Sequence, residues 1–265
     1  MDEPLTRLAL EVNWRNLALG HDVSTLEGAT FVRNTTLPDI YDANFVFNVT
    51  ASETVAIDRL LNRVSREYAH ASRITFRVGP FTPPPFEARL VLEGYERSEA
   101  ILLLLDGSLR PPNGDFRILQ IENEEGWTAY KELKRVDWRA HATEKNLDPA
   151  PAIADRLAES SRLKSSSVTN VLAYEDGRPV GHCCAWGGMD GVGQVEELFV
   201  LPEYRHRGIG TALLHHCVVR ARAQGAASTV IVVDSMNTAK EMYAALGWRP
   251  LALCRQYWID NPLMP

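Results

Sequence analysis

Apolar residues in the second half of the chain follow two spacings, one typical of strands and one typical of helices. Short apolar or alternating runs predict strands at residues 116–121, 168–175, 180–186, 192–200, 230–233 and 248–259. Apolar positions that recur every three or four residues predict helices at 127–136, 150–163, 210–223 and 238–246. The predicted order is strand, helix, helix, hairpin, strand, helix, strand, helix, strand, which indicates an α/β fold class.

The first half of the chain has a weaker pattern of the same kind. It predicts helices at 5–19, 53–71 and 86–92, and strands at 45–49, 74–78 and 100–105. The helix at 53–71 is amphipathic, and its apolar side is expected to hold Val55, Leu60, Leu61 and Val64. Three turn-forming pairs then predict a linker between the halves: Asp106-Gly107, Pro111-Pro112 and Asn113-Gly114.

A loop rich in glycine and arginine, RHRGIGT at 205–211, joins a predicted strand to a predicted helix. The first N–H groups of a helix have no partner within it, and the helix dipole adds positive charge, so this position can bind an anion. Gly208 and Gly210 have no Cβ, which lets a phosphate approach the main chain, and Arg205 and Arg207 add positive charge. Taken alone, the six residues 205–210 also fit an ordinary strand-to-helix turn with two solvated arginines.

A second informative segment, DSMNTAKEMYAALGW at 234–248, follows a short buried strand. Ser235, Asn237 or Thr238 can cap the start of the helix that it predicts. Gly247 can end that helix in the left-handed conformation.

Together the two segments resemble the GNAT superfamily of N-acetyltransferases. The family's acyl-CoA-binding motif, Arg/Gln-x-x-Gly-x-Gly/Ala after an apolar strand, is matched here by Leu198, Val200, Pro202, Arg205, Gly208 and Gly210. The family's second pattern is matched by Asn237, Ala239, Tyr243, Gly247 and Trp248. The resemblance covers about 150 residues of the C-terminal half. It implies an α/β (α+β) GNAT fold, in which helices flank a mixed central sheet.

The two halves also resemble each other. A helix, a glycine, an aromatic residue and a strand occur in that order around Gly94-Tyr95 and again around Gly247-Trp248. We therefore expect a tandem GNAT protein, with a degenerate GNAT-like domain or an unrelated cap domain at 1–110 and an acyl-CoA-binding GNAT domain at 115–265. The first copy has Thr50-Ala51-Ser52 in place of the glycine loop and Leu90 where Tyr243 lies, so we expect it neither to bind a pyrophosphate nor to supply an acid.

The resemblance implies transfer of an acyl group, usually acetyl, from acetyl-CoA to an amine of a small molecule or peptide by direct attack. In that family the main chain of one strand binds the pantetheine arm and the glycine loop binds the pyrophosphate. The corresponding positions here are Leu198, Phe199, Val200, Arg205, His206, Arg207, Gly208, Ile209, Gly210 and Thr211. Asn237 corresponds to a residue that hydrogen-bonds the pantetheine or the adduct. A helix cap is the alternative role, and one residue can serve both.

Tyr243 corresponds to the family tyrosine that protonates the departing CoA thiolate, and the alternative is a packed aromatic residue on an amphipathic helix. The base is expected to be Glu196, acting directly or through water, with Glu197 as the other candidate. Successive residues of a regular strand face opposite sides, so these two glutamates are expected on opposite faces, with Gln194 on the side of Glu196. A salt bridge to a helix is the alternative role for Glu197, and a water chain alone could also serve as base.

The acceptor is not named by the sequence. Trp127, Trp138, His141 and Trp186 are candidates for the acceptor pocket, each with a core or interface position as the alternative. A catalytically idle acyl-CoA-binding regulatory module is the other function that the motifs allow.

The net charge of −6 argues against a general nucleic-acid-binding protein. No apolar run is long enough for a transmembrane helix, and the acidic start of the chain lacks the order of a signal peptide. Cys183, Cys184, Cys217 and Cys254 lack metal-ligand spacing, so we expect reduced thiols in a cytoplasmic protein without a metal site. The oligomeric state is left open, with a homodimer among the options.

Overall fold

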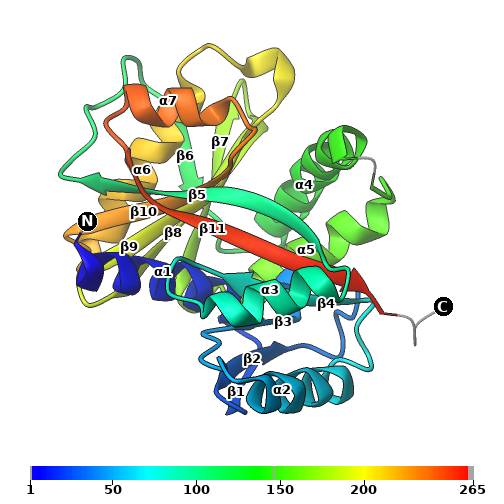
Figure 1. Ribbon diagram of the computed structural model, residues 1–265. Coiled ribbons are helices and arrows are strands. Elements are labelled where there is room, and N and C mark those ends of the chain that lie inside the picture. The colour runs from blue at the N-terminus through cyan, green and yellow to red at the C-terminus, as the bar shows by residue number, and fades with distance from the viewer. Residues whose placement is uncertain (1, 146, 262–265) are drawn as a thin grey trace. The chain divides into compact units, whose positions relative to one another are not determined.

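The computed structural model describes residues 2–145 and 147–261 (Figure 1). The chain forms two compact units, and both are assembled from segments that are distant in the sequence. The first unit contains Met1–Leu103, Val232–Lys240 and Pro250–Pro265, and the second contains Leu104–Ile231 and Glu241–Arg249.

The first unit has the strand order β1-β2-β3-β4-β11-β5. These strands are β1 (Asp22–Leu26), β2 (Ala29–Arg33), β3 (Phe45–Phe47), β4 (Arg73–Val78), β11 (Arg249–Asp260) and β5 (Glu96–Asp106). Its helices are α1 (Glu3–Ala18), the short 3₁₀ turn η1 (Tyr41–Ala43), α2 (Thr54–Glu67) and α3 (Pro84–Leu92). The sheet is mixed, because β3 and β4 are parallel whereas β1–β2, β2–β3 and β4–β11 are antiparallel.

The core of the first unit lies between its sheet and α2. Ile57, Leu60 and Val64 of α2 are buried at helical spacing, which explains why this segment forms a helix against the sheet. Val55, expected on the same side, lies in the first turn and remains exposed. The buried Tyr68 hydroxyl lies within hydrogen-bonding distance of two main-chain carbonyls, that of Val32 on β2 at 2.9 Å and that of Phe45 on β3 at 2.6 Å.

The hairpin of β1 and β2 was not predicted from the sequence. Its first strand is largely exposed, so no apolar alternation marks it. Glu27 and Gly28 form the turn, and both have positive φ angles, 48° and 73°, as a tight two-residue hairpin turn requires.

The second unit has the strand order β10-β9-β8-β7-β6. Its strands are β6 (Arg117–Gln120), β7 (Val168–Glu175), β8 (Arg178–Met189), β9 (Val192–Val200) and the first part of β10 (Ser228–Asp234), up to Ile231. Its helical segments are α4 (Glu124–Lys145), α5 (Pro151–Leu163), the 3₁₀ turn η2 (Pro202–Tyr204), α6 (Ile209–Ala223) and, from Glu241 on, α7 (Ala239–Ala245). Strands β6 to β9 are antiparallel, and β10 joins β9 in parallel.

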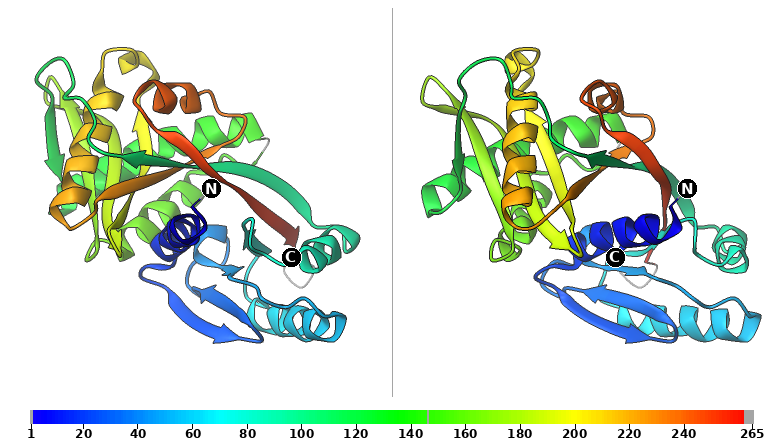
Figure 2. Two further views of the ribbon diagram at one scale, coloured as in Figure 1. Left: turned by 60° about the vertical axis from the view of Figure 1, so that its left-hand side comes forward. Right: turned by 90° about the vertical axis from the view of Figure 1, so that its left-hand side faces the viewer.

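Helices cover both faces of the sheet in the second unit (Figure 2). On one face, Tyr130 and Leu133 of α4 pack against Leu172 of β7 and Phe199 of β9. On the other face, Leu213 of α6 lies against β8 and β9. The strands β7 and β9 have the predicted bounds, and α6 begins one residue earlier than predicted.

Helix α4 is longer than predicted. It continues beyond residue 136 to Lys145 because the helical spacing of buried residues continues with Trp138 and Ala142. These two side chains pack against Ala154 of α5, so α4 and α5 remain in contact along this additional length of α4.

The chain crosses between the two units near its C-terminus. Strand β11 belongs to the predicted second half of the sequence, yet it pairs with β4 of the first unit from Arg255–Val78 to Asp260–Arg73. Compactness does not decide which segments are homologous copies, so the division into domains at 1–110 and 115–265 stays a prediction. Within the described residues, no helix is both long and apolar enough to cross a bilayer.

Candidate active site

The glycine loop lies directly after β9, where the sequence predicts an anion site. After η2 the backbone takes left-handed conformations at His206 (φ 62°) and Gly208 (φ 86°), and α6 begins at Ile209. The φ angle of Gly208 favours glycine here, and a Cβ would also make a tight contact of 3.3 Å with the ring of Phe116.

The start of α6 presents main-chain donors. The first helical hydrogen bond is that of Ala212 N–H to the carbonyl of Gly208 at 3.0 Å. The N–H groups of Ile209, Gly210 and Thr211 therefore point out of the helix end, where the dipole is positive. A Cβ on Gly210 would meet Leu198 and Val200 at 3.9 Å, an ordinary contact, so this position has room for alanine.

The two arginines of the loop hold its backbone. Arg205 Nε donates to the carbonyl of Val200 at 3.0 Å, which ties the loop to the end of β9. Arg207 donates to the carbonyl of Glu203 at 3.0 Å, lies over the ring of Tyr204, and is 3.3 Å from Glu175. With both guanidinium groups engaged, the donors available to an anion are mainly those of the main chain.

Strand β9 contains a β-bulge in its second half. The register with β8 pairs Cys184 with Glu196 and then His182 with Phe199, so it skips Glu197 and Leu198. Glu197 has a φ of 57°, a left-handed conformation that is uncommon for a residue with a Cβ. The bulge lies beyond the pairing with β10, which ends at Val230–Gln194.

The bulge places both glutamates on the face covered by α4 and α5. Glu196 shares the face of its cross-strand partner Cys184, and the carboxylate of Glu197 contacts Tyr130 of α4. The expectation of opposite faces is therefore wrong, because the extra residue shifts the alternation by one position. Gln194 lies on the side of Glu196 as expected, since its amide nitrogen donates to Glu196 Oε1 at 2.7 Å.

The carboxylate of Glu197 is held by residues of both helices. The Tyr130 hydroxyl donates to it, Ser161 Oγ of α5 lies 3.4 Å from both carboxylate oxygens, and Lys134 Nζ lies 3.7 Å away. The Lys134 ammonium opposes the effect of burial and, with the Tyr130 hydrogen bond, lowers the pKa of Glu197 to about 2. Glu197 is therefore ionised at neutral pH, although only about a third of its side chain is exposed (32%).

His182 of β8 completes this cluster without carrying charge. It is fully buried, with ring centroids 4.9 Å from Tyr130 and 5.5 Å from Phe199. Burial, followed by the nearby Lys134 ammonium, lowers the pKa of His182 to about 4, so it is neutral at physiological pH.

Tyr243 lies on α7 with only 6% of its surface exposed and packs edge-on against Trp248 at 6.3 Å. Burial raises its pKa well above the ordinary value, and the nearby Cys183 and Glu196 raise it further. The phenol is therefore protonated at neutral pH. Gly247 ends this helical segment with a φ of 94°, as predicted.

Asn237 caps the start of α7, one of the alternatives left open by the sequence. Its side-chain oxygen accepts a hydrogen bond from Ala239 N–H at 2.8 Å. Its main-chain N–H donates to Asp234 O at 2.9 Å, so both ends of the residue fix the turn before the helix.

Three of the four aromatic and histidine residues expected near the acceptor lie on α4. Trp138 is buried and donates from Nε1 to Asp148 O at 3.0 Å, His141 packs beside it, and Trp127 packs against Tyr130. Trp186 lies on β8 opposite Gln194. These contacts account for Trp138 as a core residue, and an acceptor role for the others stays a prediction.

The cluster around Glu197 was not found from the sequence. Tyr130, Lys134, Ser161 and His182 come from three elements, so no local motif joins them. One signal was available: Lys134 lies one turn from Tyr130 on the apolar side of the helix predicted at 127–136. A lysine in that position indicates a buried acidic partner.

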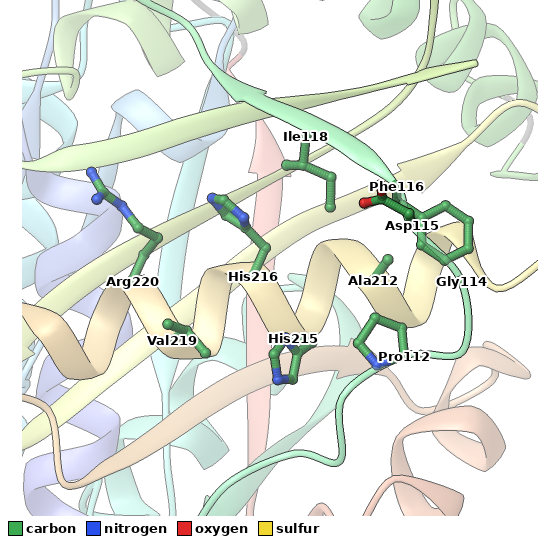
Figure 3. A pocket seen from close by; sticks show the side chains of 10 residues that line it. All are labelled: Pro112, Gly114, Asp115, Phe116, Ile118, Ala212, His215, His216, Val219 and Arg220. Carbon is green, nitrogen blue, oxygen red and sulfur yellow. The ribbon is translucent and has the colours of Figure 1, made fainter. Parts of the chain in front are cut away.

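A cavity of about 280 Å³ lies beside α6, between that helix and the segment 112–118 (Figure 3). Its lining residues are Pro112, Gly114, Asp115, Phe116, Ile118, Ala212, His215, His216, Val219 and Arg220. Phe116, which lines the cavity, also lies beside Gly208, so this segment supports the glycine loop from the side.

In the described part of the chain, no group of three or more His, Cys, Asp or Glu residues could hold a metal ion.

Comparisons with known proteins find the same fold over most of the chain and a family model that matches part of its second half. The model of the acetyltransferase (GNAT) family matches residues 127–248. A GCN5-related N-acetyltransferase from Kribbella flavida superposes with a TM-score of 0.69 over 96% of this chain and 95% of that chain, at 16% identity. No curated protein sequence matches the chain.

Two further solved structures cover most of the chain. A functionally unknown conserved protein from Staphylococcus epidermidis ATCC 12228 has a TM-score of 0.66 at 15% identity, over 91% of this chain and 94% of that chain. A tandem GNAT protein from the clavulanic acid biosynthesis pathway has a TM-score of 0.58 at 15% identity, over 83% and 76%. The predicted α/β GNAT fold, with helices flanking mixed sheets, is confirmed, and so is the resemblance to the family.

Proposed function

We propose that this chain, in which residues 127–248 form a GNAT acetyltransferase domain, transfers an acetyl group from acetyl-CoA to an amine of a small molecule or peptide. The observation that carries the proposal is the combination of three features in the second unit. These are the outward N–H groups at the start of α6, the bulge of β9 and the buried, protonated Tyr243.

The residues present suit the acyl donor. The N–H groups of Ile209, Gly210 and Thr211 would hold the pyrophosphate, with Gly208 required by the turn that aims them. The main chain of Leu198, Phe199 and Val200, as a strand that extends past its last pair with β10, would bind the pantetheine arm. Bound in this way, the donor supplies a thioester carbon that is already activated for attack by an amine.

Each proton in the proposed reaction has a group on this chain. The amine nitrogen forms the new C–N bond as the C–S bond breaks, and Tyr243 gives its phenolic proton to the departing thiolate. Glu196 takes the proton that the amine loses, directly or through water. A main-chain N–H at the bulge stabilises the negative charge that develops on the carbonyl oxygen.

Glu196 is a better candidate for the base than Glu197. The carboxylate of Glu197 is bound by Tyr130 and lies near Lys134, and its low pKa makes it a poor proton acceptor near neutral pH. Glu196 accepts from the neutral Gln194 amide and lies close enough to Tyr243 to raise its pKa.

A catalytically idle acyl-CoA-binding regulatory module is the alternative. It would need the same cradle, so acyl-CoA binding alone does not separate the two functions. The presence of both Tyr243 and Glu196 favours the enzyme, since binding and regulation require neither an acid nor a base.

The test begins with the melting temperature of the protein in the presence of acetyl-CoA, CoA and a longer acyl-CoA. A ligand that binds only the native state raises this temperature. If acetyl-CoA raises the melting temperature, the second experiment measures the release of the CoA thiol when amines are added, and we expect release with an accepted amine. Binding without thiol release from a broad amine panel would favour the regulatory module, and no rise with any of the three would contradict acyl-CoA binding.

A further inference from the structure

The bulge residue of β9 is an unusual choice for its conformation. Glycine and asparagine adopt a left-handed φ at little cost, whereas a glutamate at 57° is strained. The surrounding structure must offset that strain for the conformation to persist, and contacts made by the side chain can contribute to this. At Glu197 such contacts exist, and they come from two helices rather than from β9 itself.

The partners of Glu197 are themselves fixed. Tyr130 is 1% exposed, and its hydroxyl lies 3.1 Å from Ser161 Oγ. The single proton of Ser161 has two alternative acceptors, the Glu197 carboxylate at 3.4 Å and the carbonyl of Leu157 at 3.2 Å. Lys134 is shared between Glu197 and Asp137, with Nζ 3.5 Å from the aspartate. These side chains therefore form a rigid support under the bulge.

We propose that Glu197 is a positioning residue, whose carboxylate, held by Tyr130, Ser161 and Lys134, fixes the bulge of β9 and thereby aims the main chain at Leu198 toward the acyl carbonyl. The proposal rests on the proposed acyl transfer. It assigns to Glu197 a role different from proton transfer, and it makes the helical pair α4–α5 part of the machinery that holds the reacting carbonyl. A displacement of about 1 Å at such a donor is enough to cost much of its effect on rate.

The charged and titratable groups facing Glu197 keep this support constant near neutral pH. Lys134 and Asp137 approach from α4, Lys164 from the end of α5, and His182 and Cys184 from β8. His182 is neutral and the Cys184 thiol has a pKa raised by burial, so neither changes charge between pH 6 and 8. Replacement of Glu197 should therefore change the rate and leave the pH profile of the base in place.

The kinetic test uses Glu197→Gln, Tyr130→Phe and the double variant, with acetyl-CoA and an accepted amine. Each single variant should lower kcat by about tenfold or more, and the double variant should be no slower than the slower single, because both remove the same support. The dissociation constant of CoA, measured by calorimetry, should change by less than about threefold, since the cradle at α6 is untouched. The acid limb of the kcat/KM profile should stay where it is in the wild type.

The matched control is Glu124→Gln. Glu124 also links α4 to α5, through Arg162, but its side chain is 77% exposed and has no contact with the bulge among the described residues. It should retain wild-type kcat. A normal kcat in Glu197→Gln, additive losses in the double variant, or an equal loss in Glu124→Gln would each overturn the proposal.

A second readout does not depend on turnover. In the free wild-type protein and in Glu197→Gln, amide hydrogen exchange is compared in a peptide from β9 and in one from β7. Exchange should rise in β9 alone. Unchanged exchange in β9 would overturn the proposal even if no amine is accepted, whereas a wild-type protein that fails to bind acetyl-CoA contradicts only the proposed function.

Discussion

At the scale of single residues, two glycines of one loop meet different demands. Gly208 has a left-handed backbone and the ring of Phe116 beside it, whereas Gly210 lies within the first turn of α6, where an added Cβ would make only ordinary contacts. The family motif, which allows alanine at the position of Gly210 and not at that of Gly208, agrees with this difference. In the structure, the backbone conformation favours glycine at position 208, whereas position 210 has room for a small side chain.

The substitutions Gly208→Ala and Gly210→Ala should therefore differ. Gly208→Ala forces a Cβ into a left-handed turn at a cost of about 1 kcal/mol or more and should weaken CoA binding at least about tenfold. Gly210→Ala should leave CoA binding within about threefold and raise stability slightly, because alanine favours the helix. Calorimetry and thermal unfolding measure both effects, and equal losses in the two variants would contradict the different roles.

Tyr243→Phe tests the proposed acid. It should lower kcat by about a hundredfold while the affinity for CoA persists, since the ring and its packing against Trp248 are retained. The raised pKa of Tyr243 means that the phenol stays protonated to at least pH 10, so no alkaline loss of kcat from this group is expected below that value. Tyr174→Phe on β7 is the matched control, and an unchanged kcat in Tyr243→Phe would exclude the role of acid.

At the scale of elements, the sequence predicts helices and strands well where one face is apolar. It predicts features poorly where they depend on contacts between residues far apart in the sequence. Strands β7 and β9 and helix α6 follow from periodicity and glycine placement. The exposed strand β1 has no such signal. The bulge of β9 could not be predicted either, because a left-handed glutamate is stabilised by Tyr130 and Ser161 on elements remote in the sequence.

The packing of α4 and α5 onto β8 and β9 should make the protein sensitive to acid in two ranges. His182 has a folded pKa of about 4 against an ordinary 6.5, and Glu197 has about 2 against 4.5. Folding lowers both pKa values, so each group leaves the free energy of unfolding at its full value when the pH is above the ordinary pKa. As the pH falls, the unfolded state binds the proton first, and the free energy of unfolding decreases. This decrease occurs between pH 6.5 and 4 for His182 and between pH 4.5 and 2 for Glu197.

The free energy of unfolding, measured in denaturant from pH 7 to pH 3, checks this prediction. Glu197→Gln should be less stable than the wild type at pH 7, and its loss of stability below pH 4.5 should be shallower. The exposed Glu203 on η2 provides the control Glu203→Gln. Parallel curves for the wild type and Glu197→Gln below pH 4.5 would contradict the low pKa of Glu197.

At the scale of the whole molecule, the repeat in the sequence and the similarity in fold to a tandem GNAT protein agree with the prediction of two related halves, of which the second carries the proposed chemistry. The motif residues for pyrophosphate binding and for the acid are found in the second half. In the first half, β3 is followed by Asn48 with a φ of 52° and by Glu53, which caps α2 without a side-chain hydrogen bond. Periodicity predicts most elements of both halves, the hairpin of β1 and β2 excepted, but not the return of β11 to pair with β4, because strand pairing across such a distance leaves no local pattern.

If only the second half binds the nucleotide, each chain should bind one CoA molecule, and this stoichiometry can be measured. The first half has Thr50-Ala51-Ser52 where the second has its glycine loop, and the α2 helix that follows begins without glycines that would let a phosphate reach its N–H groups. Calorimetric titration with CoA should therefore give a stoichiometry of about one, and Gly208→Ala should weaken that single event without leaving a second. A stoichiometry of two, or a tight binding event that survives in Gly208→Ala, would show that the first half binds the nucleotide by contacts other than a glycine loop.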